Sequence, residues 1–248
     1  MKLRLIVIDS MLSTAYLLVS HGSRDPRPEM AMQQLAKLVC EKLPDSKQLV
    51  GIAALELSAQ PLHEQIRQFA ESALASGCSS LKIVPLFLLP GVHVMTDIPA
   101  EVALAQQAIG EDMMIDLLPY LGTHPGFGKL LARPLANIKA EAAILLAHGS
   151  RRPGSQEQLS ATADNLGAVV ACWAVPPSLE SRVKELVAAG SRQIAILSYF
   201  LFAGGITDAI AKSVEELKLQ FPGVTFQLTE PLGASPELAL LICNLIDT

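Results

Sequence analysis

The sequence predicts an α/β protein built from two tandem copies of one small domain, each with a small parallel sheet flanked by helices. Short apolar runs alternate with stretches of helical period along the chain. In addition, three segments of the first half recur in the same order in the second: residues 18–24 resemble 145–151, residues 77–88 resemble 190–201, and residues 121–125 resemble 232–236. An ordered repeat indicates an internal duplication, so we expect one domain over residues 1–139 and another over residues 140–248.

The repeated segment at the start of each half predicts a strand and the turn after it. Residues 16–20 and 143–147 are nearly continuous apolar runs, which are typical of strands buried on both faces of a parallel sheet. Each run leads into the sequence His-Gly-Ser-Arg, at His21 and at His148. In the first half, the turn is followed by apolar residues spaced for one face of a helix: Met30, Leu35, Leu38 and Val39.

The remainder of the first half continues the alternation of strand and helix. We expect strands over residues 51–57, 81–89 and 113–118, because these runs are apolar and are bounded by turn residues. Helices are expected over residues 61–76, where a glycine follows, and over residues 98–109. This order predicts a parallel sheet with helices on both faces.

The composition of the 248-residue chain favours a large buried core and excludes several kinds of partner. Half of the residues are apolar and 17% are charged, so disorder is not expected. The net charge of −5 offers no basic field for nucleic acid. The four cysteines form no CxxC pair, which argues against a zinc cage or an iron–sulfur cluster and favours buried thiols in a reducing cytoplasm.

The N-terminal segment shares one feature with targeting signals, since Lys2 and Arg4 precede an apolar run. Asp9 interrupts that run, and no small-residue cleavage site precedes His21. We therefore expect a strand-forming extension over residues 1–20. No stretch is long and apolar enough to span a membrane, and the protein is expected in the cytoplasm.

Four polar side chains lie near the ends of the four strands expected in the first half. His21 follows the first strand, Glu56 lies near the end of the second, His93 follows the third, and His124 follows the fourth. In parallel α/β sheets, ligands bind outside the carboxyl ends of the strands. We therefore expect all four side chains to point toward one rim of the sheet.

His21 and His93 carry the functional hypothesis, because a neutral imidazole binds borderline divalent metals and is also a base near pH 7. Glu56 has two interpretations that the sequence leaves open, a functional carboxylate or a solvated strand end. His124 precedes a proline and is expected to serve a turn or the pocket rim rather than a metal. His63 is expected in the exposed first turn of a helix.

Several residues beside the histidines have alternative roles. Ser23 or Asp25 could cap the helix that follows the first turn. Arg24 could meet a carboxylate of a ligand or pair with Asp25. Asp97 could orient the histidine four residues before it or cap the helix after it, and we favour capping.

The second half keeps the histidine of the repeat and lacks its companions. The residues opposite the candidate groups are Trp173 for Glu56, Ser235 for His124, and Gly204 or Ile206 for His93. A site that needs several donors cannot be built from these residues. The second half is therefore predicted not to catalyse, although it could wall a pocket.

Three features together resemble one known family. They are the His-Gly-Ser-Arg-Asp-Pro turn at residues 21–26, the duplication, and the segment Pro-Leu-Phe-Leu-Leu-Pro-Gly-Val-His-Val-Met-Thr-Asp-Ile-Pro at residues 85–99. The chain resembles the CbiX/SirB family, the class II sirohydrochlorin cobaltochelatases and ferrochelatases. The resemblance covers almost the whole chain, and the segment around His93 is its most specific part.

The resemblance implies two chelatase-like domains with a pocket in the cleft between them. The implied reaction is insertion of Fe²⁺ or Co²⁺ into the tetrapyrrole sirohydrochlorin, without ATP, on the route to siroheme or cobalamin. The metal is then a substrate, and no tightly bound cofactor is expected. A monomer with an internal pseudo-dimer is expected.

The resemblance also assigns residues to the implied site. Its two metal-site histidines fall on His21 and His93, and its carboxylate falls on Glu56; the same three are the expected catalytic groups. A polycarboxylate substrate would need anchors such as Arg24, and a flat macrocycle would need an apolar wall, for which Leu88 is one candidate. The expected substrate contacts also include Ser23, Leu89, Gly91 and Val92.

Two rival functions share some of these features. Histidine phosphatases also place a strand before an Arg-His-Gly turn, but Ser20 and Ala147 stand where their phosphate-binding arginine is needed. A non-catalytic carrier of tetrapyrrole or metal would use every residue named above. The sequence does not separate this carrier from an enzyme.

Overall fold

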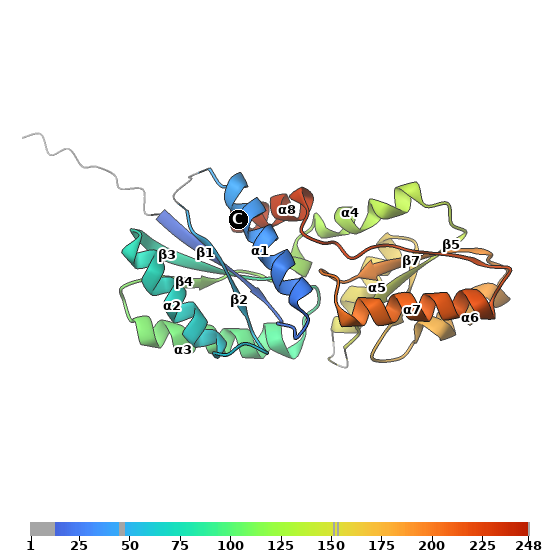
Figure 1. Ribbon diagram of the computed structural model, residues 1–248, viewed down its shortest axis with the longest axis horizontal. Helices are drawn as coiled ribbons and strands as arrows, with labels where there is room; N and C mark the ends of the chain where they lie inside the picture. Colours follow the sequence, from blue (N-terminus) through green and yellow to red (C-terminus); the bar gives the residue numbers. More distant parts are fainter. Residues whose placement is uncertain (1–12, 45–47, 151, 153, 248) are drawn as a thin grey trace, which may run out of the picture.

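The computed structural model describes residues 13–44, 48–150, 152 and 154–247. It has two four-stranded sheets, one in each half of the chain, and all six strand pairs are parallel (Figure 1). The expected tandem α/β fold is thereby confirmed. The expected N-terminal extension lies mostly outside the described residues. Among the helices that the structure describes, none is long and apolar enough to cross a membrane.

The first sheet has the strand order β2-β1-β3-β4. The elements of this half are β1 (Ser13–Ser20), α1 (Pro26–Lys42), β2 (Val50–Ala54), α2 (Leu62–Ala75), β3 (Cys78–Pro85), a π-helical turn (His93–Asp97), α3 (Ile98–Ile109) and β4 (Met114–Leu117). Three short helices then lead to the second half: η2 (Leu121–Thr123), α4 (Phe127–Ala132) and η3 (Pro134–Asn137).

The second sheet repeats this arrangement with the order β6-β5-β7-β8. Its elements are β5 (Ala142–Ala147), α5 (Ser155–Asn165), β6 (Ala168–Cys172), α6 (Leu179–Ala188), β7 (Gln193–Tyr199), α7 (Gly205–Gln220), β8 (Thr225–Leu228) and α8 (Pro236–Ile246). Because the connection order is the same in both sheets, the structure bears out the duplication.

Strand β1 is buried on both faces, as its apolar run predicts. Ala15, Leu17 and Val19 pack with residues of α2 and α3 on one face of the sheet. Tyr16 and Leu18 point to the other face and pack with residues of α1 and α8. This alternation is the period of two expected of a strand.

The buried face of α1 differs from the expected one. Met30 was expected on it but is 64% exposed, whereas Met32 is 2% exposed and packs beside Leu35 and Val39. A helix turns by about 100° per residue, so Met30 lies about 160° around the axis from Met32. Leu38 is half-buried at the edge of this face.

Two strands end earlier than their apolar runs. Strand β2 ends at Ala54 rather than at residue 57, and β3 covers Cys78–Pro85 rather than residues 81–89. Leu86 lies beyond β3 but is 3% exposed, because it packs in the core between the two halves. Apolar character therefore continues past the end of the hydrogen-bonded strand.

The last helix of each half packs against the other half (Figure 1). Helix α8 lies against α1, and Lys82 of β3 donates from Nζ to the carbonyl of Ile246 at 2.7 Å. Conversely, α4 of the first half packs on the second half: the ring of Phe127 contacts Tyr199 of β7 edge to face, with ring centroids 6.0 Å apart. The two halves thus exchange their terminal helices.

This exchange creates one hydrophobic core that both halves share. We call it the common core; its members include Leu18, Leu35, Leu145, Leu159 and Ile242. Each sheet has a second core on its opposite face, formed with α2 and α3 in the first half and with α6 and α7 in the second.

Candidate metal site

His21 lies at the end of β1, in the middle of three neighbouring strand ends. The turn after it depends on Gly22, which has a φ of +96°. A Cβ at this position would lie 1.9 Å from the carbonyl oxygen of Glu56. This close approach lets the backbone N–H of Glu56 donate to the carbonyl of His21 at 2.9 Å, which ties the two loops together.

Glu56 follows β2 on one side of His21. The side chain of Gln65 on α2 holds the end of the strand, because it accepts from the N–H of Ala54 at 3.1 Å and donates to its carbonyl at 2.8 Å. Leu57 then turns the chain away with a φ of +58°, which is unusual for a residue other than glycine. Glu56 therefore stands at the open end of the strand rather than inside it.

His93 begins the π-helical turn after β3, on the other side of His21. Its Nδ1 lies 2.8 Å from Oδ2 of Asp97. The expectation that Asp97 caps α3 is wrong. The backbone at Asp97 is helical (φ −71°, ψ −51°) and its side chain makes no capping bond, whereas a capping residue needs an extended backbone.

The three side chains converge from the carboxyl ends of β2, β1 and β3. Nε2 of His21 is 4.0 Å from Oε2 of Glu56, and Nδ1 of His93 is 3.9 Å from Oε1 of Glu56. The imidazole rings are perpendicular, with centroids 4.8 Å apart. One donor atom from each residue lies within 4.8 Å of the others. A metal with bonds near 2.1 Å separates its donors by about 3–4.2 Å, so small side-chain rotations would suffice to bind one.

The chemistry of this cluster suits a borderline divalent ion. In the tautomer in which Nδ1 of His93 donates to Asp97, the lone pair of Nε2 is free for a ligand. His21 and Glu56 are about half exposed, at 51% and 47% of their side chains, so an ion could arrive from solvent. Two imidazoles and one carboxylate bind such ions without enclosing them.

The two remaining histidines of the first half stay outside the cluster. His124 follows β4, the strand farthest from β2 in the sheet, and its Nδ1 accepts from the N–H of Gly126 at 3.0 Å. It therefore serves the turn. His63 lies in the first turn of α2 as expected, but it is half-buried rather than exposed, since its Nδ1 lies 2.8 Å from Oε2 of Glu101.

A largely apolar cavity of about 500 Å³ adjoins His21 between the two halves. Its lining from the first half is Ser20, His21, Gly22, Ser23, Pro28 and Leu86. Its lining from the second half is His148, Phe200, Leu201, Phe202, Gly204, Gly205, Ile206 and Thr207. The sequence reasoning missed Phe200, Leu201 and Phe202, although the repeat aligns them with the segment before His93.

Of the expected substrate contacts, Ser23 lines this cavity. Leu89 packs against the common core, and Val92 is 54% exposed. The carbonyl of Gly91 accepts from Nη1 of Arg152 at 3.4 Å. The structure does not place these last three residues in the wall of the cavity.

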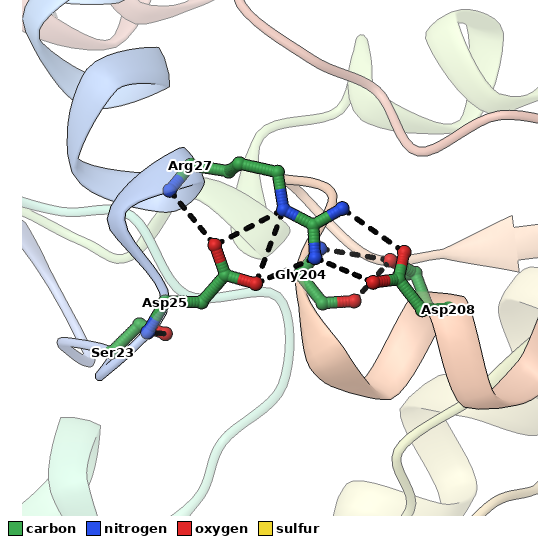
Figure 2. A network of polar contacts seen from close by, with 6 residues as sticks. Ser23, Asp25, Arg27, Gly204 and Asp208 are labelled. Atoms are coloured by element: carbon green, nitrogen blue, oxygen red, sulfur yellow. Dashed lines mark hydrogen bonds and ion pairs between the residues drawn. The ribbon is translucent and has the colours of Figure 1, made fainter.

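Arg24 is exposed and has no ion-pair or hydrogen-bond partner among the described residues. Asp25 caps α1 by accepting from the N–H of Arg27 at 3.0 Å, and it pairs with Arg27 rather than with Arg24. Figure 2 shows that the same guanidinium bridges to Asp208 of α7, at 3.1 and 2.5 Å. The hydrogen bonds from Arg27 lower the pKa of Asp25 to about 2 and also lower the pKa of Asp208.

The second half repeats the backbone of this site without its donors. The N–H of Ala174 donates to the carbonyl of His148 at 2.9 Å, as that of Glu56 does to His21. The residue opposite Glu56 is therefore Ala174, and the expectation that it is Trp173 is wrong by one position. Within the described residues, the group formed by His21, Glu56 and His93 has no counterpart in the second half.

Comparison of the sequence with known proteins identifies its family. The family model for CbiX matches residues 15–138 and again residues 142–248. A sirohydrochlorin cobaltochelatase of Priestia megaterium is 24% identical over 91% of this chain and 76% of that protein. A sirohydrochlorin ferrochelatase of Bacillus subtilis is 25% identical over 93% of this chain and 89% of that protein.

A solved structure shares the fold. SirB from Bacillus subtilis with Fe³⁺ superposes with a TM-score of 0.76 at 21% identity, over 95% of this chain and 94% of that one. The family match covers both repeats and nearly all of the described residues. The chain therefore belongs to the CbiX family.

Proposed function

We propose that this protein is a sirohydrochlorin chelatase, a lyase that inserts Fe²⁺ or Co²⁺ into sirohydrochlorin in the biosynthesis of siroheme or cobalamin. The observation that carries the proposal is the convergence of His21, Glu56 and His93 beside an apolar cavity. The two relatives named above are sirohydrochlorin chelatases, which supports the same assignment here.

His21 and His93 hold the incoming ion in this proposal, and Glu56 completes the site. The ion must exchange these donors and water for four ring nitrogens, so a site with few donors favours transfer over retention. The imidazoles and the carboxylate also offer bases for a proton leaving the ring. Asp97 is a positioning residue that holds the ring of His93 through Nδ1.

The cavity between the halves would hold the macrocycle. Phe200, Leu201 and Phe202 offer an apolar wall to a flat ring. Arg24, which is exposed and follows the cavity-lining Ser23, is the proposed anchor for a substrate carboxylate. The first half, residues 1–139, would thus hold the metal, and the second half, residues 140–248, would wall the pocket.

The metal is a substrate in this proposal, and the reaction requires no resident cofactor and no ATP. Both sides of the cavity come from one chain, so we propose that a monomer is active. Among the described residues all four cysteines are free thiols, which suits the cytoplasm proposed here.

Insertion kinetics test the proposal. Purified protein is mixed anaerobically with sirohydrochlorin and either Co²⁺ or Fe²⁺, and the absorption change is followed over many turnovers. We expect His21→Ala and His93→Ala each to lose more than about 100-fold in rate, because each removes a direct ligand. His124→Asn, which keeps an acceptor for the N–H of Gly126, is the matched control and should retain the wild-type rate.

Two results would contradict the proposal. Insertion near the wild-type rate by both alanine variants would exclude the metal site. Binding of sirohydrochlorin and metal by the wild-type protein, with no turnover above the spontaneous rate, would instead make it a carrier.

A further inference from the structure

His148 lines the same cavity as His21, from the opposite half of the molecule. The two histidines occupy equivalent places, since each follows the central first strand of its sheet and each accepts a backbone hydrogen bond of 2.9 Å from the neighbouring loop. The cavity therefore has one imidazole contributed by each half.

His148 is not equipped to bind a metal. The position opposite Glu56 holds Ala174, and either Gly204 or Ile206 stands opposite His93. Within the described part of the chain, the ring of His148 has no hydrogen-bond or ion-pair partner, and the residue is exposed. A single imidazole of this kind is a weak metal ligand but a good proton acceptor near neutral pH.

We infer that His148 is a catalytic base for the insertion reaction, acting on the ring from the side opposite the metal site. This inference rests on the proposed function. Insertion breaks two pyrrole N–H bonds, and the electron pair left on each nitrogen forms a bond to the metal. The ring thereby takes up one dication and releases two protons, with no oxidation or reduction.

The two pyrrole protons need different acceptors. The first can pass to a side chain of the cluster of His21, Glu56 and His93 when that side chain releases the ion and its lone pair becomes free. Once the dication lies at the ring, a second proton on that cluster would be repelled by it. His148 accepts this second proton across the cavity and passes it to solvent, to which its side chain is exposed.

The rival role for His148 is recognition, in which it donates a hydrogen bond to a substrate carboxylate. The two roles affect different constants. Loss of a base lowers kcat, whereas loss of a binding contact raises KM for sirohydrochlorin and leaves kcat unchanged. Glutamine separates the roles further, because its amide donates a hydrogen bond but does not accept a proton at neutral pH.

The experiment compares the full-length wild type, His148→Gln and His148→Ala in anaerobic Co²⁺ insertion, with Co²⁺ affinity measured separately by calorimetry. We expect kcat to fall about 100-fold in both variants, as for loss of a general base. KM for sirohydrochlorin and the Kd for Co²⁺ should stay within about twofold of wild type. The control is His124→Asn, which should match the wild type throughout.

Each other outcome overturns the inference. A wild-type kcat in His148→Gln would show that no proton acceptor is needed there. A raised KM with unchanged kcat would assign His148 to substrate binding, and a weakened Co²⁺ affinity would assign it to the metal. A wild-type protein that does not insert metal at all would overturn the proposed function, and this inference with it.

Discussion

At the scale of single residues, the carboxylate of Asp97 sets the chemistry of His93. A histidine that binds a metal through one nitrogen needs a fixed partner for the other. The contact of 2.8 Å from Asp97 to Nδ1 provides this partner. It exists because the π-helical turn keeps both residues on one short segment.

Substitution of Asp97 should therefore weaken metal binding without unfolding the protein. We expect Asp97→Asn to raise the Kd for Co²⁺ by about 10–100-fold, and Asp97→Ala to raise it further, because asparagine keeps a neutral acceptor. Calorimetric titration with Co²⁺ measures this. Asp164→Asn, at an exposed position of α5, is the matched control.

Equal Co²⁺ affinities in wild type and Asp97→Ala would show that Asp97 does not position the ligand. A lowered unfolding temperature with an unchanged Kd would give it a merely structural role.

The sequence was sufficient to predict His21 and His93 as candidate metal ligands, since both follow strands that belong to one parallel sheet. Glu56 was undecided, because whether a strand stops at residue 54 or 57 depends on the side chain of Gln65, which lies on a different element. Asp97 was assigned wrongly because a capping residue and a π-helical residue are both followed by a helix. Trp173 was misaligned by one position, as the repeat does not reveal the register of β6.

At the scale of elements, the N-terminus of α1 is joined to α7 by Arg27. This guanidinium binds Asp25 in its own turn and Asp208 across the boundary between the halves (Figure 2). Both helices border the cavity through Pro28 and Thr207. The ion-pair cluster thus fixes the separation of two of its walls.

Asp25→Asn should be less stable than the wild type at neutral pH. In acid, this difference in stability should disappear. Asparagine caps helices as well as aspartate, so the variant removes only the charge. The folded-state pKa of Asp25 is about 2, below the unfolded value of about 3.9. Its stabilisation is therefore complete above about pH 4 and is lost as the pH falls toward 2.

Thermal unfolding of the two proteins from pH 7 to pH 2.5 measures this effect. We expect a difference of about 1–3 °C at pH 7, since the pair is exposed and screened, and a smaller one below pH 3. A difference that is constant over the whole range would mean that the charge of Asp25 contributes nothing.

At the scale of the whole molecule, both halves contribute buried side chains to the common core, so we expect them to unfold together. Ile242 on α8 is fully buried in this core against the first half, whereas Leu240 on the same helix is 52% exposed. Apolar runs predicted the strands on both sides of this core. The apolar runs did not predict that the two halves exchange their terminal helices, because a helix with one strongly apolar face can cover either sheet.

Ile242→Ala should therefore destabilise the entire chain. Removal of the buried side chain costs about 2–5 kcal/mol, and we expect a single calorimetric transition at a lower temperature. Leu240→Ala is the control from the same helix and should change stability little. Two separate transitions, with only one shifted, would show that the halves unfold independently.

The exchange of terminal helices also determines which parts of the second half can tolerate substitution. A second half without metal ligands still supplies α8, and the first sheet would present an uncovered apolar face without it. Apart from His148, the strand ends of the second half should therefore tolerate substitution better than its closing helix does. We therefore expect a chain shortened to its first repeat to expose part of the common core, because the second half supplies the helix that covers it.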